Sequence, residues 1–223
     1  EIRGDGTLFR HERTFKHTFA AAVGLYSGGG RRIVCKFHRR RQFMGFPLGG
    51  VGRLMARYEA AVLGHCQDLQ GVPRLVPVDR PGVLAHEFVP GEPLHRNSRV
   101  DDEFFPRLFR LLRQIHKRGV AYVDLEKCEN ILVGEEGAPW LIDFQVAFYV
   151  PPRLGGETTL VRKVRGWLQR ADIYHARKHL RRVRPDLLDA EAERRSRIKP
   201  WPVRLGNSLV APYKKLRRYL KEG

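Results

Sequence analysis

Three side chains that carry oxygen ligands lie around one predicted β-hairpin. Two short apolar runs, residues 131–133 (ILV) and 140–142 (WLI), enclose the turn-forming segment GEEGAP, and this pattern predicts two antiparallel strands. Asn130 precedes the first run, Asp143 follows the second, and Asp124 lies upstream in the loop that leads into the hairpin. Because Asn130 and Asp143 share the open end of the hairpin, their oxygens can converge, and such a set suits a hard cation such as Mg²⁺.

A glutamate upstream of this hairpin lies on the apolar face of a predicted helix at residues 53–69. The apolar positions of that helix are Leu54, Met55, Tyr58, Val62, Leu63 and Cys66. At helical spacing they cover one half of the wheel, and Glu59 falls within their arc. A carboxylate on an apolar face is costly unless it is paired, so Glu59 either has a cationic partner or reaches solvent at the boundary of the face. Before this helix, a glycine turn at 27–30 leads into a predicted strand at 31–37 that carries Lys36.

The composition is that of a globular protein with an excess of positive charge. The chain has 223 residues, of which 42% are hydrophobic and 30% are charged, so it can bury a substantial core. Lys and Arg outnumber Asp and Glu by 42 to 24, which gives a net charge of +18, and most of this excess lies in residues 151–223. Such a surface suits an anionic partner: a nucleic acid, a phospholipid head-group layer or a phosphorylated glycolipid.

The cysteine and hydropathy patterns favour a reduced, cytoplasmic setting. Cys35, Cys66 and Cys128 are widely spaced, and the sequence contains no metal-binding arrangement of His and Cys. It also contains no run of about 18 apolar residues, so no transmembrane helix is expected.

The residues around the hairpin resemble the catalytic core of the protein-kinase-like superfamily. In that family an Asp of the catalytic loop orients the acceptor hydroxyl, and a downstream Asn and the Asp of a D-F-G motif hold the metal ion. The resemblance implies these roles for Asp124, Asn130 and Asp143, the last in the sequence D-F-Q. Two differences stand out: five residues separate Asp124 from Asn130 where the family has four, and Gln145 replaces the final glycine.

The preceding segments resemble the small lobe of the same family. The sequence IVCK at 33–36 matches the family motif V-A-I-K, which implies that Lys36 binds the α- and β-phosphates of ATP and that Glu59 pairs with it. The phosphate-covering motif G-x-G-x-x-G is absent. The segment 13–18, rich in basic residues, occupies its place, where it either substitutes for the backbone cradle or leaves phosphate binding weak.

Residues 74–78 and 83–89 predict two more strands, and the stretch LAHEFVPGEPL resembles the hinge between the two lobes of a kinase. This resemblance implies that the backbone of Glu87 and Val89 binds adenine. We therefore expect an α+β, two-lobe protein-kinase-like fold, with a β-rich small lobe at 1–89 and a helical large lobe with a basic tail at 90–223. Asp101 or Asp102 is predicted to cap a helix. The apolar face of that helix comprises Phe104, Phe105, Leu108, Leu111, Leu112 and Ile115.

Within the superfamily the chain looks most like the bacterial lipopolysaccharide-core kinases that act on Kdo and heptose, with the RIO-type kinases as near relatives. It is compact, lacks the A-P-E motif, and continues after Asp143 into basic helical segments and an amphipathic tail at 213–220. The resemblance implies transfer of the γ-phosphate of ATP, with Mg²⁺, to a hydroxyl of an anionic glycolipid. We expect a monomer in the cytoplasm, peripheral at the inner membrane face and attracted to anionic lipid by the tail.

Two alternatives remain open. The first is a RIO-like serine/threonine protein kinase, with a protein acceptor and a nucleic-acid partner. The second is a pseudokinase, a basic module that binds a membrane or RNA; Gln145, the longer loop and the missing glycine motif favour it. The residues that favour an enzyme are Lys36, Glu59, Asp124, Asn130 and Asp143. Aromatic residues are scarce among the basic residues at 163–184, so a nucleic acid is the less favoured partner.

Overall fold

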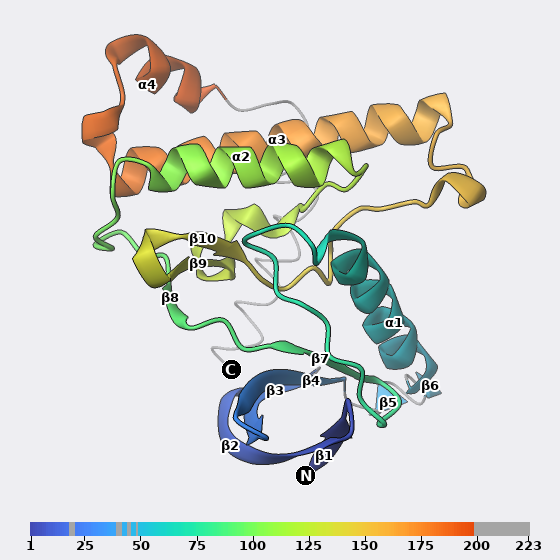
Figure 1. Cartoon of the computed structure of the whole chain (residues 1–223). Coiled ribbons are helices and arrows are strands. Elements are labelled where there is room, and N and C mark those ends of the chain that lie inside the picture. The colour runs from blue at the N-terminus through green and yellow to red at the C-terminus, as the bar shows by residue number, and fades with distance from the viewer. Residues whose placement is uncertain (18–20, 39–41, 44–45, 48, 199–223) are drawn as a thin grey trace, which may run out of the picture.

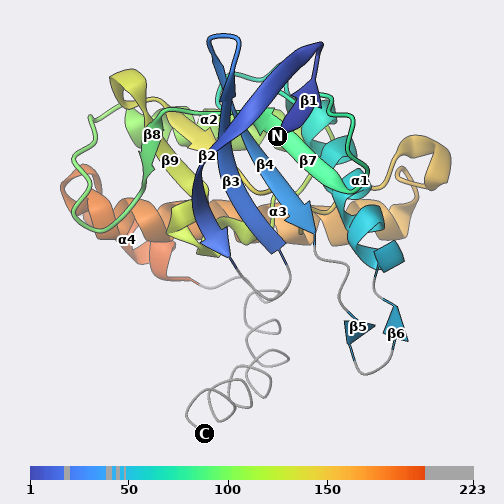
Figure 2. The ribbon, with the colours of Figure 1, turned by 90° about the horizontal axis from the view of Figure 1, so that it is seen from below.

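The computed structural model describes residues 1–17, 21–38, 42–43, 46–47 and 49–198, and this part of the chain forms an α+β fold of two lobes (Figure 1). A curled antiparallel sheet and helix α1 (Gly49–Cys66) form the small lobe. The large lobe consists of a short three-stranded sheet and the helices α2 (Phe104–Lys117), α3 (Thr159–Val183) and α4 (Ala190–Arg197). Seen from below, the strands of the small lobe lie side by side, and α1 runs beside β7 (Figure 2).

The sheet of the small lobe has the order β1-β2-β3-β4-β7, and all neighbours are antiparallel. Its strands are β1 (Ile2–Gly4), β2 (Thr7–His17), β3 (Ala21–Gly28), β4 (Arg31–His38) and β7 (Val83–Glu87). Alternation along β4 sends Ile33 and Cys35 into the core of the small lobe and Lys36 to the opposite face. The predicted turn between β3 and β4 is present, and Gly29 and Gly30 supply its positive φ angles of 56° and 73°. Strands β5 (Gln42–Phe43) and β6 (Phe46–Pro47) form a separate small ladder.

Three predicted elements of this lobe differ from the structure, and one of them is the strand predicted at 83–89, which ends at Glu87. Helix α1 begins at Gly49 instead of residue 53 and ends at Cys66 instead of residue 69, and Leu54 is 68% exposed instead of part of the apolar face. Residues 74–78 are not a strand; they contribute only isolated bridges, in which Val78 pairs with Gly4 and Leu75 with His86. Val76 lies between these two bridges in the sequence and packs into the core of the small lobe. This packing keeps the segment against the sheet without regular strand pairing.

The predicted hairpin of the large lobe is confirmed. Strands β9 (Ile131–Gly134) and β10 (Pro139–Leu141) pair antiparallel, and β8 (Gly91–Pro93) adds a third strand beside β9. Helix α2 buries the predicted apolar face, including Phe104 and Phe105, under this sheet. Neither predicted acidic cap serves that helix: its N-cap is Glu103, and the carboxylate of Asp101 binds Arg107 instead.

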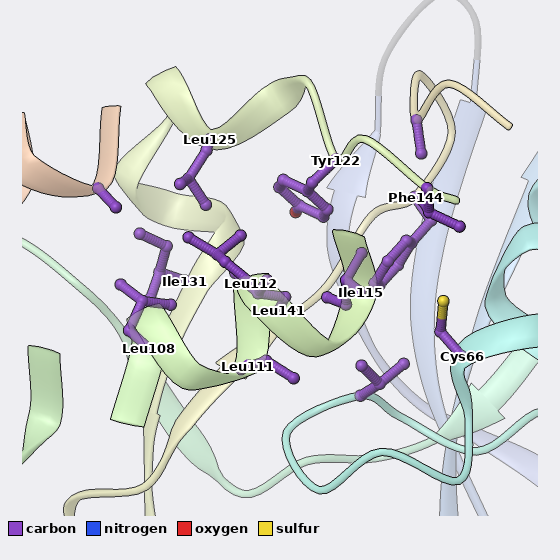
Figure 3. Packing of buried hydrophobic residues seen from close by; sticks show 14 of the residues in the cluster. Cys66, Leu108, Leu111, Leu112, Ile115, Tyr122, Leu125, Ile131, Leu141 and Phe144 are labelled. Carbon is purple, nitrogen blue, oxygen red and sulfur yellow. The ribbon is translucent and has the colours of Figure 1, made fainter. Parts of the chain in front are cut away.

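One continuous hydrophobic core joins α1, α2, the hairpin and α3 (Figure 3). Leu125, from the predicted catalytic loop, and Phe144, next to Asp143, are both buried in it. Because these two neighbours are buried, the core fixes where Asp124 and Asp143 lie. The basic tail at 213–220, where the sequence predicts an amphipathic helix, lies outside the described residues. No described helix is long and apolar enough to cross a membrane. The lobe boundary at 89/90 stays a prediction.

Candidate active site

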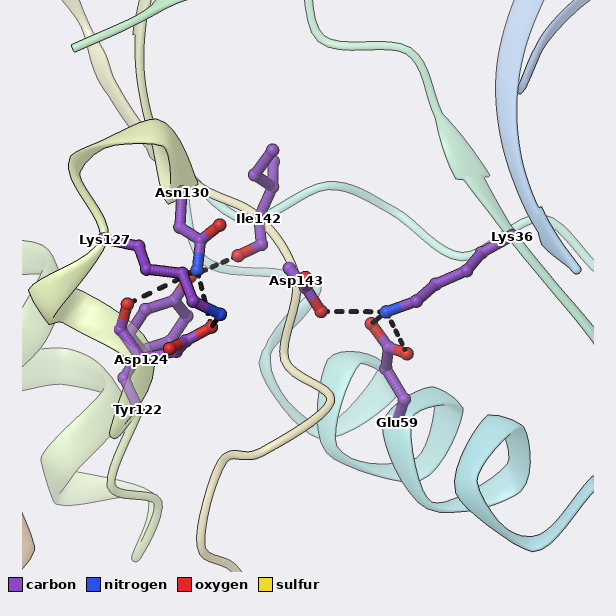
Figure 4. Close-up of polar contacts among 8 residues, drawn as sticks. All are labelled: Lys36, Glu59, Tyr122, Asp124, Lys127, Asn130, Ile142 and Asp143. Carbon is purple, nitrogen blue, oxygen red and sulfur yellow. Dashed lines mark hydrogen bonds and ion pairs between the residues drawn. The ribbon is translucent and has the colours of Figure 1, made fainter. Parts of the chain in front are cut away.

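A lysine and two carboxylates meet where the lobes face each other (Figure 4). The ammonium Nζ of Lys36 lies 2.9 Å from Oε2 of Glu59 on α1 and 2.8 Å from Oδ1 of Asp143. The side chain of Glu59 is 2% exposed, that of Lys36 11% and that of Asp143 40%. The structure therefore gives Glu59 the cationic partner that its place on an apolar face requires, and not access to solvent.

The two carboxylates respond differently to the same lysine. Burial raises the pKa of Glu59 to about 7, and the charge of Lys36 offsets only part of this effect. Burial also acts to raise the pKa of Asp143, but there the charge and hydrogen bond of Lys36 outweigh it, and the pKa is lowered. Asp143, the more exposed group, is thus the carboxylate that stays ionised near neutral pH and can bind a cation.

Asp124 lies in a loop made of two short 3₁₀ turns, Asp124–Glu126 and Cys128–Asn130. Lys127 joins the turns in an extended conformation, and its Nζ lies 2.6 Å from Oδ2 of Asp124. The same oxygen accepts a hydrogen bond of 2.9 Å from Nδ2 of Asn130. Sequence analysis did not single out Lys127, although a lysine three residues after the candidate catalytic Asp was a usable signal.

Asn130 and Asp143 hold the expected places at the end of the hairpin, and the N–H of Ile142 donates to the carbonyl of Asn130 at 3.1 Å. Their side chains turn apart, however: the amide of Asn130 binds Asp124, and the carboxylate of Asp143 binds Lys36 (Figure 4). Among the described residues no group of three or more Asp, Glu, His or Cys side chains forms a metal cage. A carboxylate and a carboxamide oxygen supplemented by phosphate oxygens and water suit Mg²⁺, so the donor set fits this ion.

The backbone is strained on both sides of the site. Val123, just before Asp124, has a φ of 70°, and Asp143 has a φ of 62°. A positive φ is rare for any residue with a side chain and is a true outlier for a β-branched one. Such strain persists only where the surroundings fix it, and it concentrates at functional sites.

Asp172, a residue of α3 that sequence analysis missed, holds the strained backbone before Asp124 in place. Its side chain is fully buried, and its two carboxylate oxygens accept hydrogen bonds of 2.8 Å from the backbone N–H groups of Tyr122 and Val123. Nε2 of His116 lies 3.0 Å from the same carboxylate. The available signal was that Asp172 is the single acidic residue in the otherwise basic or neutral α3.

Further contacts connect the elements that carry the candidate residues. The Tyr122 hydroxyl donates to the carbonyl of Ile142, which ties the loop before Asp124 to the residue before Asp143. On α1, the hydroxyl of Tyr58 contacts the backbone of residues 147–149, and the ring of His65 stacks on Tyr149 with centroids 4.6 Å apart. These contacts join the two aspartates and α1 into one unit.

The residues predicted to form the hinge, Glu87 and Val89, lie at the end of β7 and just after it. The N–H of Phe88 donates to the carbonyl of Arg32 at 3.0 Å, so this residue still pairs with β4, whereas Val89 is buried. Nδ1 of His86 lies 2.8 Å from the carbonyl oxygen of Glu87. This oxygen has a second lone pair, so it can still accept a hydrogen bond from a base, and the adenine roles of Glu87 and Val89 stay predictions.

The comparison with protein-family models gives no match, and neither does the comparison with curated protein sequences. Among solved structures, the chain is similar to the Rio2 kinase–ADP/Mg²⁺–phosphoaspartate complex from Chaetomium thermophilum, with a TM-score of 0.57 and 17% sequence identity. The similarity covers 90% of this chain and 66% of that one, slightly under two thirds of its length. At this identity the likeness shows the fold, and the two-lobe kinase-like fold is thereby confirmed.

Proposed function

We propose that the protein is a phosphotransferase that moves the γ-phosphate of ATP, with Mg²⁺, to a hydroxyl group. The observation that carries this proposal is the position of Lys36, which bridges Glu59 and Asp143 beside the Asp124–Asn130 pair. In kinases the corresponding groups hold the phosphates, the metal ion and the acceptor. The Rio2 kinase structure with the same fold contains ADP and Mg²⁺, which supports the same cofactors here.

In this mechanism Lys36, oriented by Glu59, binds the α- and β-phosphates. Asp143 and Asn130 would hold Mg²⁺, which when bound would supply positive charge to neutralise the phosphate oxygens. Asp124 accepts a hydrogen bond from the acceptor hydroxyl and takes its proton as the oxygen–phosphorus bond forms and the bond to ADP breaks. Lys127, at 2.6 Å from Asp124, adds positive charge beside the transferred group.

For the acceptor we propose an anionic glycolipid, bound by a protein that is peripheral at the inner membrane face. Two leucines, Leu154 in the 3₁₀ turn before α3 and Leu160 in the first turn of α3, are each 70% exposed. Arg153 and Arg162 are exposed nearby in the sequence. Exposed apolar side chains among basic ones are typical of segments that lie on an anionic membrane surface. The basic tail would add to this attraction.

A RIO-like protein kinase is the second candidate, and the similarity to the Rio2 kinase structure favours it. The two candidates share their site and differ in the acceptor. A pseudokinase would keep the site and lose turnover; Gln145 and the missing glycine motif support this third reading.

The test is transfer of labelled phosphate from ATP to candidate glycolipids, proteins and water by the purified chain. The Asp124→Asn variant should lower turnover by about two to four orders of magnitude, the usual contribution of a positioned acid–base group, with little change in ATP affinity. Glu129→Gln, an exposed carboxylate in the same loop, is the matched control and should keep its activity. A wild-type chain that binds ATP but transfers phosphate to no acceptor would contradict the enzyme and support the pseudokinase.

A further inference from the structure

The register of the small-lobe sheet shows which side chains line the face that carries Lys36. Directly paired residues of antiparallel strands point to the same face. Lys36 pairs with Leu84 of β7 and with Val23 of β3, and Val23 pairs in turn with Lys16 of β2. Lys16 and Lys36 therefore belong to one row on the face that looks toward Glu59 and the large lobe.

A second row lies next to this one, nearer the hinge. Val34 pairs with His86 of β7 and with Leu25 of β3, and Leu25 pairs with Arg13 of β2. A third row begins at Arg32, whose carbonyl accepts the N–H of Phe88. At about 3.3 Å per residue, Arg32 lies roughly 13 Å from Lys36 along the strand, which is about the extent of a nucleotide from its base to its phosphates.

Two β-bulges in β2, on either side of Arg13 and Thr14, alter the direction of the side chains there. The register with β3 shifts between His11 and Arg13 and again between Thr14 and Lys16, so Phe15 is an extra residue within the second bulge. Bulges of this kind re-aim side chains and are frequent beside active sites. Phe15 consequently lies parallel to the hinge residue Phe88, with ring centroids 6.3 Å apart and planes 9° apart.

Each of the two rings also has an arginine guanidinium over it. The guanidinium of Arg13 lies 4.9 Å from the centroid of Phe15, and that of Arg32 lies 4.6 Å from the centroid of Phe88. Both distances are within the range of cation–π attraction. Phe15 is nevertheless 45% exposed, so a large part of its ring remains available for another aromatic surface.

We propose that the side chains of β2 bind the nucleotide in place of the missing glycine motif. In this arrangement the exposed part of the Phe15 ring stacks against the base, Phe88 and Arg13 hold that ring in position, and Lys16 joins Lys36 at the phosphates. The ligand class is a nucleoside triphosphate, because a stacking surface at one end and two ammonium groups at the other match its two ends. The inference rests on the proposed function and specifies how that site holds its nucleotide.

The experiment is calorimetric titration of the full chain with two probes, Mg²⁺–ATP and Mg²⁺–tripolyphosphate. Phe15→Ala should weaken ATP binding about tenfold, the usual contribution of one base–aromatic stack, and leave tripolyphosphate binding unchanged. Lys16→Gln should weaken the binding of both probes by a similar factor. Phe15→Trp keeps a stacking surface and should restore ATP affinity. The matched control is Leu8→Ala, a 42% exposed apolar residue of the same strand, which should change neither affinity.

Each outcome distinguishes this inference from the function on which it rests. A wild-type chain that binds neither probe overturns the proposed function and the inference together. A wild-type chain that binds ATP while Phe15→Ala binds it equally well overturns the inference alone. Equal loss of both probes in Phe15→Ala, with a lower melting temperature and no recovery in Phe15→Trp, assigns the stack to the stability of the sheet and also overturns it.

Discussion

The hydroxyl of Tyr58 donates a hydrogen bond of 2.7 Å to the carbonyl oxygen of Ala147, across the boundary between helix α1 and the segment that follows Asp143. The same hydroxyl accepts a hydrogen bond of 3.0 Å from the N–H of Tyr149. Tyr58 directly precedes Glu59, the partner of Lys36. One side chain thus fixes the distance between the helix that orients Lys36 and the segment that begins with Asp143.

The Tyr58→Phe variant removes both hydrogen bonds and keeps the ring. Because each such bond contributes about 1 kcal/mol, we expect turnover to fall about tenfold or more, with a smaller change in ATP affinity. Tyr149→Phe keeps the ring that stacks on His65 and serves as the control. The decisive measurement is the double variant with Glu59→Gln: if Tyr58 acts by positioning Glu59, the two effects on kcat are not additive. Fully additive effects would assign Tyr58 to general stability.

Asp143 should make nucleotide binding depend on a divalent metal ion. We expect calorimetry to show that Mg²⁺ or Mn²⁺ tightens ATP binding to the wild type and not to Asp143→Ala, because this carboxylate stays ionised at the open end of the hairpin and can bind a cation. Asp101→Ala removes a partly exposed carboxylate paired with Arg107, away from this hairpin end, and should retain the metal dependence. Equal metal dependence in wild type and Asp143→Ala would remove Asp143 from the metal site.

Histidines packed against the loop that carries Asp124 should make the fold sensitive to acid. Burial lowers the pKa of His175 and His179 below the usual 6.5, and Nε2 of His179 donates to the carbonyl of Leu125 at 2.7 Å. Because the folded state prefers the neutral rings, their contribution to stability is present above pH 6.5 and is lost as the pH falls below it. Other charged groups around these rings are Glu126, Asp172, Lys178 and Arg182.

Denaturant unfolding between pH 8 and pH 5 measures this effect. The free energy of unfolding of the wild type should fall with acidification, and that of His179→Gln should fall less, because the amide still donates to Leu125 but does not titrate. His95→Gln replaces an exposed histidine and should follow the wild type. Identical slopes for His179→Gln and the wild type would show that protonation of His179 does not oppose folding.

Local patterns were sufficient to predict the parts of the site that depend on neighbouring residues. The hairpin of β9 and β10 follows from two apolar runs and a turn, which act over a few residues. The burial of Glu59 follows from helical spacing alone, since its place among apolar neighbours requires a partner. The start of α1 was placed too late because glycine has a low helix propensity, and the GGVG run is nevertheless helical.

Contacts between distant segments gave no comparable signal. Asp172 and Tyr122 are 50 residues apart, and Tyr58 and Ala147 are 89 apart. The two residues of each pair meet only after α3 and α1 pack on the large lobe. No residue spacing within a single helix or strand therefore predicts the contact. The stack of Phe15 on Phe88 likewise depends on two bulges, which change the direction of side chains without a motif in the sequence.

Helices α2 and α3 expose basic side chains without acidic neighbours on the same helix. They lie side by side (Figure 1), and their single acidic residue, Asp172, is buried against the backbone of Tyr122 and Val123. The exposed basic residues are Arg110, Arg113, Lys117, Arg162, Lys163, Arg170, Arg177 and Arg182. Since each contributes about 1 kcal/mol beside an anionic membrane, even three or four would concentrate the protein there measurably.

Vesicle co-sedimentation tests whether this surface recruits the protein to its acceptor. Binding should rise with the fraction of anionic lipid and fall with added salt. It should weaken when Arg113, Lys117, Arg170 and Arg177 are changed to Gln, and also when Lys214, Lys215, Arg217 and Arg218 of the tail are changed to Gln. The charge-matched control changes the exposed residues Arg3, Arg53, Arg57 and Arg74 of the small lobe to Gln and should bind as the wild type does.

The opposite result has an equally definite meaning, because a basic surface also attracts the phosphates of nucleic acids. Strong RNA binding at physiological salt, with no preference for anionic vesicles, would contradict membrane recruitment and favour the RIO-like candidate. Equal loss of vesicle binding in the small-lobe control and in the α2–α3 variant would show that only net charge matters. In that case the orientation of the site toward a lipid-linked acceptor would lose its support, whereas the catalytic roles of Asp124 and Asp143 would stand on their own tests.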